Sequence, residues 1–452
     1  MEIRKLLFLF LAVAAPQAFG EMKTGVGISV ITPHEDMWMS GYASRKEPSS
    51  GKIHDLYGKA LAIDDGAGSR VVVVTTDLIG LPSAISDRVA EAAKAKHGIE
   101  RSGLMLTSSH THCGPVVRGN LMSMYALDEV QGKKVALYAE FLVEALNKAV
   151  DEAIANLRPG ELHWGHGHAT FAKNRRQYTV GGLVNGINPI GPVDHDVPLL
   201  VARNGDGSIK AVLFGYACHN TTLSFQQICG DYAGFAQAYI QENIPGATAL
   251  FAMGCGADAN PQPRGKLELA QQHGTELGKA VLEGLEGELK SISGPIHAAF
   301  EETALPLTPP PTREEVEAQL NDKDVYIQRR AQWLLESIDR DGPLKASYPC
   351  PVQVWRFGND LQITALGGEV VVDYALRIKY ELGQDNQFVV AYANDVFAYV
   401  PSLRILREGG YEGDTSMIYY GLYGPWAPEV EDTLLDAVRR LTKQTGGKLL
   451  EQ

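Results

Sequence analysis

The chain has 452 residues, a formal net charge of -13, 45% hydrophobic residues and 21% charged residues. This balance provides enough apolar surface for a sizeable core and excludes a largely disordered chain. The acidic charge also argues against nucleic acid or an anionic membrane as the main partner, because those surfaces select for clustered Lys and Arg.

Residues 1–20 are predicted to be a secretory signal peptide. Arg4 and Lys5 form the charged start, an apolar run extends from Leu6 to Ala15, and Ala18-Phe19-Gly20 matches a small-residue cleavage site. The alternative, an N-terminal anchor helix, would need about 18 apolar residues, more than this run provides. We therefore expect a secreted or periplasmic protein without a transmembrane span, cleaved near Gly20.

The rest of the chain alternates between strand and helix patterns. Short apolar runs bounded by polar or glycine turns predict strands, and these runs are Arg70 to Thr75, Leu104 to Thr107, Ala211 to Phe214 and Phe388 to Ala391. Apolar residues at three- and four-residue spacing predict helices over Ser83 to Lys96, Val135 to Ala155, Phe235 to Asn243, Leu267 to Leu285, Arg313 to Leu335, Val370 to Glu381 and Glu429 to Leu441. The alternation predicts an α/β fold in which mixed β-sheets are flanked by helices.

Prolines between Pro306 and Pro311 mark the best candidate for a break in the chain, because they exclude helix and central strand. Chemically suggestive residues lie on both sides of this segment, so we expect one catalytic domain over residues 21–452. Five cysteines leave one odd thiol and are widely scattered. We expect at most one or two disulfides, of unknown pairing.

The first chemically suggestive segment is Ser-Ser-His-Thr-His-Cys-Gly-Pro, which follows the predicted strand Leu104 to Thr107. It places His110 and His112 at a sheet edge, where many α/β active sites are built. The two imidazoles would face the same side if the strand continued. Alone, this pair fits hydrogen-bonded loop histidines equally well.

Two further segments have a similar design. His219 follows the strand Ala211 to Phe214 and precedes a Thr-rich turn, and Glu369 follows a strand and a Gly-Gly turn where a helix is predicted to open. Neutral imidazoles delivered from rigid elements are what zinc requires. Helix capping is the alternative role for Glu369. Asp231 at the start of another helix could cap that helix, orient a histidine, or both.

Other histidine-rich segments are weaker candidates. His163, His166 and His168 could form a second metal site, but alternation on a surface strand explains them equally well. Asp194-His195-Asp196 is predicted to be a turn that enters a strand. The chain has no Gly-x-Ser-x-Gly, His-Glu-x-x-His or phosphate-binding motif, which disfavours serine esterases, common zinc proteases and nucleotide enzymes.

The order of the motifs resembles that of the neutral (non-lysosomal) ceramidase family. The matching segments are Ser-His-Thr-His-x-Gly-Pro, Asn174-Arg175, a strand ending in Ala-x-His, Gly-Asp-x-x-Gly, Gly-x-Glu, Ala393-Asn394, Tyr399-Val400 and Tyr411-Glu412-Gly413. They run from about Gly25 to near the end of the sequence. The resemblance implies a zinc-dependent hydrolase of this family's catalytic fold.

The resemblance also implies roles for particular residues. The zinc ligands would be His110, His219, Glu369 and Tyr399, of which Tyr399 has two other tyrosines near it in the sequence. The catalytic residues would be Arg175 as a donor to the scissile carbonyl, His112 as a neighbouring acid, base or supporting donor, and Tyr411.

Two departures from the family put ceramide itself in doubt. The family carries Gly-Asp-x-Ser-Pro-Asn, whereas alignment on Asp and Pro here places Asn260 at the position of the serine. An amide is not a nucleophile, so Asn260 would orient water or donate to an oxyanion while zinc-activated water attacks. The sequence also ends without the C-terminal β-sandwich domain typical of the family.

We therefore expect an exported zinc hydrolase that cleaves an amide, N-acyl or ceramide-like bond in a small-molecule or lipid substrate. The alternatives are a hydrolase of a polar ester, lactone or sugar derivative, and a non-catalytic binding protein that retains the scaffold. An apolar groove beside the zinc would favour a long-chain lipid, and a small polar pocket would favour a polar substrate. The oligomeric state is not predicted by the sequence.

Overall fold

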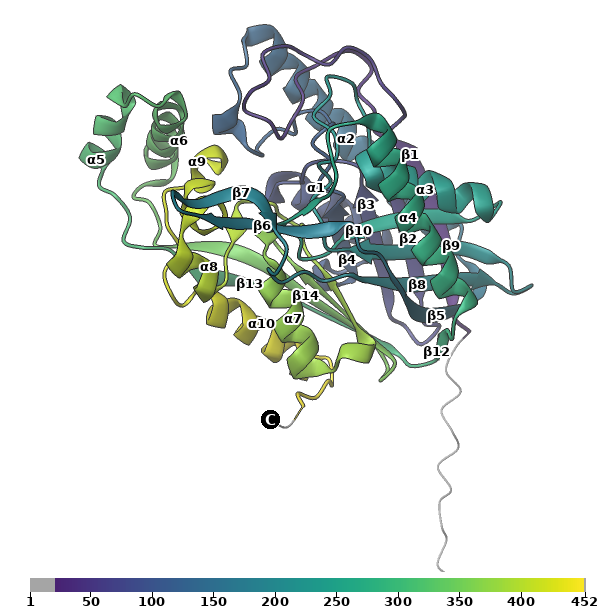
Figure 1. The fold of residues 1–452 in the computed structure, drawn as a ribbon. Coiled ribbons are helices and arrows are strands. Elements are labelled where there is room, and N and C mark those ends of the chain that lie inside the picture. Colours follow the sequence, from purple (N-terminus) through teal and green to yellow (C-terminus); the bar gives the residue numbers. More distant parts are fainter. Residues whose placement is uncertain (1–20, 451–452) are drawn as a thin grey trace, which may run out of the picture.

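The computed structural model describes residues 21–450, so the expected signal peptide at residues 1–20 lies outside the described residues. Two β-sheets pack face to face, and helices cover the outer face of each sheet. Figure 1 shows α3 and α4 on one side of the sheets and α7 and α10 on the other. The expected α/β class with mixed sheets flanked by helices is confirmed.

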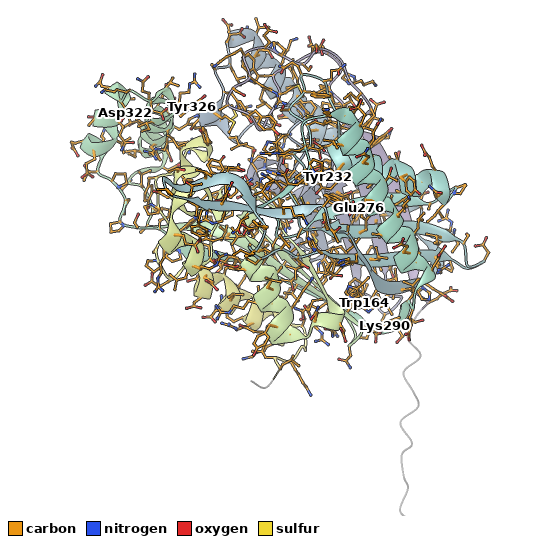
Figure 2. The ribbon with its side chains drawn as sticks, viewed as in Figure 1. Trp164, Tyr232, Glu276, Lys290, Asp322 and Tyr326 are labelled. Atoms are coloured by element: carbon orange, nitrogen blue, oxygen red, sulfur yellow. The ribbon has the colours of Figure 1, made fainter. Side chains whose placement is uncertain are left out.

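The larger sheet has nine strands in the spatial order β10-β9-β8-β5-β1-β2-β3-β4, with β12 added beside β5. Its strands are β1 (Lys23–Val30), β2 (Tyr57–Asp64), β3 (Arg70–Thr76), β4 (Leu104–Ser108), β5 (Arg158–His168), β8 (Asp196–Asn204), β9 (Ile209–Tyr216), β10 (Thr248–Met253) and β12 (Lys290–Ile292). The pairs β3/β4 and β9/β10 are parallel. At the β5/β12 edge the ammonium of Lys290 lies 5.9 Å from the ring centroid of Trp164 (Figure 2).

The second sheet has four strands in the order β13-β14-β15-β17. These are β13 (Ile296–Pro306), β14 (Ser347–Phe357), β15 (Leu361–Leu366) and β17 (Gln387–Val390). Two small pairings complete the β-structure. β6 (Ala172–Thr179), β7 (Gly182–Asn188) and β11 (Ala259–Pro261) form one, and β16 (Glu369–Val370) and β18 (Tyr399–Val400) form the other.

The helices follow the layers. The outer face of the large sheet is covered by α1 (Ser83–His97), α2 (Glu129–Ala155), α3 (Asp231–Asn243) and α4 (Leu267–Glu286), and that of the second sheet by α7 (Val372–Leu382) and α10 (Val430–Gln444). The remaining helices are α5 (Arg313–Ala318), α6 (Val325–Asp341), α8 (Leu403–Glu408) and α9 (Met417–Tyr420). Within residues 21–450, no helix combines the length and apolarity that crossing a bilayer requires.

The valine run of β3 explains how the layers assemble. Val71 and Val73 belong to the apolar cluster between the two sheets, whereas Val72 and Val74 belong to the cluster beneath α1 and α2. Successive side chains of a strand point to opposite faces, so a strand buried on both faces is apolar throughout. This is why the run from Arg70 to Thr75 lacks polar alternation.

Several sequence-based boundaries were wrong. The single helix expected over Arg313 to Leu335 is two helices, α5 and α6, separated by a short 3-10 turn, and Asp324 caps the second helix through its side chain. The helix expected from Val370 begins at Val372, because Glu369 and Val370 pair with β18 instead. All five cysteines are buried free thiols, so none of the disulfides that the sequence allowed is formed.

Candidate metal centre and active site

Loops at the ends of strands from both sheets meet at one point. His110 follows β4 and His219 follows β9 in the large sheet, while Glu369 and Tyr399 are register partners in the parallel pair β16/β18 beside the second sheet. The strand does not continue through His110, as its backbone is left-handed with φ of 60°. For a residue other than glycine this is a strained conformation, which a structure retains where it aims a functional side chain.

The four predicted zinc ligands converge in the folded chain. The Oε2 atom of Glu369 lies 3.2 Å from His110 Nε2 and 3.3 Å from His219 Nε2. His219 Nε2 in turn lies 3.0 Å from the hydroxyl of Tyr399. Each of the four side chains is at most 3% exposed. Two imidazoles and a carboxylate, which are ligand types that zinc favours, are therefore brought together with a tyrosine hydroxyl away from water.

The protonation of this donor set fits a metal ion. His110 Nδ1 lies 2.6 Å from the carbonyl of Ile79, and His219 Nδ1 lies 2.9 Å from the carbonyl of Gly256. An Nδ1–H donor at each position leaves the Nε2 lone pair directed into the cluster. Burial, together with the charge of Arg175, lowers the pKa of His219 to about 4. The imidazole is therefore neutral at pH 7, as metal ligation requires.

His112 joins the same cluster. Its Nε2 lies 3.1 Å from His110 Nε2, and its buried Nδ1 has no hydrogen-bond partner among the described residues. Burial first, and then the neighbouring histidines, lower the pKa of His112 well below its ordinary value. Two neutral imidazole nitrogens that face each other repel unless a proton or a cation lies between them. By geometry His110, His112 and His219 can together surround a metal ion.

A glycine makes room for His112. Gly41 has a left-handed backbone with φ of 92°, and a Cβ atom there would lie 2.5 Å from the His112 ring. The ring of Tyr42 packs against His112 with 4.9 Å between centroids. Gly41-Tyr42 therefore shapes the site, although it stands about 70 residues earlier in the chain. Nothing local in the sequence distinguishes this glycine from an ordinary turn.

Arg175 approaches the cluster from β6. Its Nη2 atom lies 3.1 Å from the Tyr399 hydroxyl, and its Nε donates to Glu412 at 2.6 Å. Glu412 also accepts from Arg176 at 2.5 Å, and Arg176 forms a second ion pair of 3.0 Å with Glu408. Two carboxylates therefore pair with the two buried guanidinium groups, and Arg175 extends from this network to the cluster as a fixed donor.

The other two catalytic candidates flank Arg175. The Oδ1 atom of Asn260 lies 3.5 Å from Arg175 Nη1, and its Nδ2 donates to Asn185 of β7 at 3.1 Å. The ring centroid of Tyr411 lies 5.7 Å from the Arg175 guanidinium carbon. Tyr411 opens a π-helical turn, Tyr411–Thr415, that also positions Glu412. All eight predicted site residues therefore lie within one contact network.

Sequence reasoning missed two tyrosines that hold Glu369. The hydroxyl of Tyr392 lies 3.3 Å from Glu369 Oε2, and the hydroxyl of Tyr420 donates to Glu369 Oε1. Tyr392 has a left-handed backbone with φ of 53°. Tyr420 lies on α9, a helix of four residues without a recognisable motif. No sequence signal pointed to it.

A cavity adjoins the cluster at Tyr420. It has a volume of about 330 Å³ and is lined by the ring of Tyr420, by α6 and by the segments around residues 340–349 and 420–423. Apolar side chains such as Leu307, Trp333, Leu344 and Leu422 make up much of its wall. Arg340, Asp341 and Lys345 line another part of the cavity, so its wall is apolar on one side and charged on the other. The apolar side can accommodate a hydrocarbon group.

The remaining candidates have structural roles. Asp194 and Asp196 form ion pairs of 2.7 and 2.9 Å with the ammonium of Lys379, and Asp196 also contacts His166 Nδ1 at 2.7 Å. Asp231 accepts from the backbone N–H of Leu223 at 2.8 Å and from that of Tyr232, so it does not orient a histidine. Within residues 21–450, the histidines of β5 take part in no group of three potential metal ligands.

Comparison with known proteins places this chain in the neutral/alkaline non-lysosomal ceramidase family. The family model of neutral/alkaline non-lysosomal ceramidase, N-terminal, matches residues 22–254, a little over half of the chain. Neutral ceramidase from Pseudomonas aeruginosa is 25% identical over 271 residues, which cover 56% of this chain and 39% of that protein. Neutral ceramidase from Oryza sativa subsp. japonica is 28% identical over 230 residues, 48% of this chain and 28% of that protein.

The same relationship is visible in the fold. The crystal structure of neutral ceramidase from Pseudomonas aeruginosa matches with a TM-score of 0.70 at 20% identity, over 93% of this chain and 74% of that one. A second structure, of ceramidase complexed with C2, matches with the same score. The chain spans 39% or less of the two curated relatives described above. His110, His112, Arg175 and His219 lie within the segment that the family model matches, whereas Glu369 and Tyr399 lie beyond it.

Proposed function

Because the chain belongs to the neutral/alkaline non-lysosomal ceramidase family, we propose that it is a zinc-dependent hydrolase that cleaves the amide bond of a ceramide-like N-acyl lipid. The observation that carries this proposal is the convergence of His110, His219, Glu369 and Tyr399 beside Arg175. We further propose that the protein is exported and that residues 21–452 form one catalytic domain.

In this proposal the four converging residues would hold zinc through the two Nε2 atoms, Glu369 Oε2 and the Tyr399 hydroxyl. When bound, zinc supplies Lewis-acid activation of water for attack on the acyl carbonyl. The Nδ1–H groups of His110 and His219 keep both rings oriented through backbone carbonyls. Tyr392 and Tyr420 hold the carboxylate of Glu369 in place.

Arg175 and His112 would carry the remaining steps. Arg175 donates N–H to the carbonyl oxygen as negative charge develops there, and its contacts with Glu412 and Tyr399 fix the plane of the guanidinium. His112 Nε2 accepts the proton of the attacking water and passes it to the departing nitrogen. Burial lowers the pKa of His112, so the ring is neutral and has a free lone pair before the reaction. Tyr411 and Asn260 keep Arg175 in position.

The cavity beside Tyr420 supports a lipid substrate. Its apolar wall suits an acyl chain, and Tyr420 connects it to Glu369. A second candidate function is hydrolysis of a polar ester, lactone or sugar derivative. It is favoured by the polar side chains beside Arg175, where Asn185, Thr221 and Asn260 form a hydrogen-bonded group. A substrate screen that pairs a long-chain ceramide with a small polar amide and ester separates the two candidates.

The first prediction tests the metal centre and separates ligands from the acid–base residue. We expect about one zinc per chain in the wild type, little zinc in His110→Ala and His219→Ala, and full zinc with greatly reduced ceramide hydrolysis in His112→Gln. Loss of a direct ligand removes a donor atom that the site cannot replace. His112 is proposed to transfer protons, so its substitution should leave zinc binding intact. Zinc is measured by elemental analysis and hydrolysis with a fluorescent ceramide.

The matched control is His168→Ala. It removes an exposed histidine of β5 that does not contact the cluster. It should retain both zinc and activity. Wild-type zinc content in the His110 and His219 variants would overturn the assignment. Loss of zinc in His112→Gln would make His112 a ligand instead of the proton carrier.

A further inference from the structure

The β6/β7 hairpin and the turn after it, residues 177–191, expose an unusual number of apolar side chains. Fifteen large hydrophobic residues are exposed in the described part of the chain, and five of them fall within these fifteen residues. They are Tyr178, Val180, Val184, Ile187 and Ile190. Val180 is fully exposed, and Ile190 is 94% exposed. The stretch contains no Asp, Glu, Lys or Arg.

A single exposed apolar side chain is ordinary, but a concentration of them in one uncharged segment is not. Soluble proteins rarely leave such patches in water, and a patch of this kind marks a surface that another molecule covers. The other exposed hydrophobic residues are distributed over β1, α2, the α5–α6 segment, α7 and the end of the described chain. We call residues 177–191 the apolar hairpin. Val180 lies at the turn between its two strands, whereas Ile190 lies at the opposite end, just beyond Asn188, which pairs with Asn174.

The apolar hairpin is anchored to the candidate active site. β6 carries Arg175, and Asn185 of β7 accepts from Asn260, which itself lies next to Arg175. The inner side of the hairpin packs on the segment after α8, because a Cβ atom at Gly410 would come within 2.8 Å of Leu183 Cδ2. Figure 1 shows the hairpin crossing the face of the molecule toward α8 and α9. A surface that covers the apolar hairpin would therefore also lie close to the site.

We propose that the apolar hairpin lies on the surface of a zwitterionic lipid bilayer, inserts its exposed apolar side chains there, and holds the active site against it. This inference rests on the proposed lipid-amide hydrolysis. The absence of charge in the apolar hairpin leaves nothing to pair with anionic headgroups, and the net charge of -13 disfavours an anionic membrane. Aliphatic side chains accompanied by a tyrosine suit the boundary between headgroups and acyl chains.

The test compares binding to phosphatidylcholine vesicles. We expect the wild type to sediment with the vesicles and Val180→Asp/Ile190→Asp to bind at least tenfold more weakly, because two carboxylates would enter the headgroup boundary. The matched control is Val130→Asp/Leu137→Asp, which introduces the same charges at two exposed apolar positions of α2. This control should bind as the wild type does. Circular dichroism and melting temperature verify that all three proteins are folded.

Activity assays separate this inference from the proposed function. The hairpin variant should hydrolyse a dispersed short-chain ceramide at the wild-type rate, yet hydrolyse long-chain ceramide in phosphatidylcholine vesicles at least tenfold more slowly. If neither the wild type nor any variant hydrolyses either substrate, the proposed function is wrong. Vesicle binding still tests the proposed membrane docking in that case.

Three outcomes would overturn the docking itself. These are a wild type that does not bind phosphatidylcholine vesicles, a hairpin variant that binds as well as the wild type, and binding that requires anionic lipid. Sedimentation velocity without lipid provides a fourth. A wild-type dimer that the hairpin substitutions convert to a monomer would show that a second copy covers the apolar hairpin.

Discussion

At the scale of single residues, the candidate site depends on hydrogen bonds that orient the potential ligands. His110 and His219 are each oriented through Nδ1, and Glu369 through the hydroxyl groups of Tyr392 and Tyr420. Such supporting contacts determine how precisely a metal site is formed. The candidate ligands were predictable from family motifs, but Tyr420 was not, because it contacts Glu369 from 51 residues away through a hydrogen bond that only folding creates.

Tyr420 provides the second prediction. We expect Tyr420→Phe to weaken zinc binding by about 10- to 100-fold, because Glu369 loses the hydrogen bond that fixes its carboxylate while the ring still lines the cavity. Affinity is measured by competition with a chelator. Tyr419→Phe removes a neighbouring hydroxyl that makes no described contact with Glu369, and it should bind zinc normally. Equal affinities in the two variants would show that Tyr420 does not support the carboxylate.

The third prediction concerns Asn260, which stands where the family has a serine. If Asn260 only positions Arg175, Asn260→Ala should raise the barrier by no more than about 2.7 to 4 kcal/mol, the effect of one oxyanion-type donor. Activity then falls but stays measurable by kcat/KM, and Asn243→Ala at the exposed end of α3 leaves it unchanged. An inert wild type beside a ceramide-cleaving Asn260→Ser variant would contradict the proposed mechanism and identify a lost nucleophile.

At the scale of elements, strand ends were predicted better than the segments between them. The runs before His110 and His219 are strands as expected, because fully buried strands have an apolar signature. Glu369 was expected to open a helix, yet it pairs with Tyr399 in a parallel bridge of two residues. A strand pairing of only two residues has no recognisable pattern in the local sequence. The helix expected over Arg313 to Leu335 was divided for a local reason, since Asp324 caps a new helix there.

The fourth prediction tests how α7 is joined to the large sheet. Lys379 of α7 is 8% exposed and pairs with Asp194 and Asp196 at the start of β8. Removing its charge in Lys379→Met leaves two largely buried carboxylates unpaired, and we expect unfolding free energy to fall by about 3 kcal/mol. Urea unfolding at pH 7 measures this. Lys279→Met, at an exposed position of α4, should change stability little. An equal effect in both variants would contradict the role of the pair.

The pH dependence of this difference follows from the signs of the pKa shifts. Burial disfavours ionisation of Asp196, but the hydrogen bond with His166 and the charge of Lys379 outweigh it and lower the pKa below 3.8. Its contribution is present above that value and disappears as the pH falls further. Burial is likewise outweighed for Lys379, whose pKa is raised above 10.5 by the two aspartates, so its contribution is lost above that pH. The stability difference should therefore be constant between about pH 5 and 9.

At the scale of the whole molecule, the candidate metal centre lies where the two sheets meet. His110 and His219 come from loops of the large sheet, whereas Glu369 and Tyr399 come from segments that follow strands of the second. One apolar cluster, which includes Met105 of the large sheet and Trp355 of the second, fills the space between them. The two layers therefore share both a core and a candidate set of ligands, and they should unfold together.

The last prediction follows from this connection. A ligand that binds only the folded chain stabilises it by RT ln(1 + [L]/Kd), or about 2.7 kcal/mol when free zinc is at 100 times its Kd. Calorimetry should therefore show one unfolding transition, which moves upward when zinc is added to chelator-treated protein and involves both sheets. His110→Ala should show the same single transition without the zinc-dependent shift, whereas His168→Ala should retain that shift. Two separate transitions, of which zinc moves only one, would show that the ligands do not bind across the sheets.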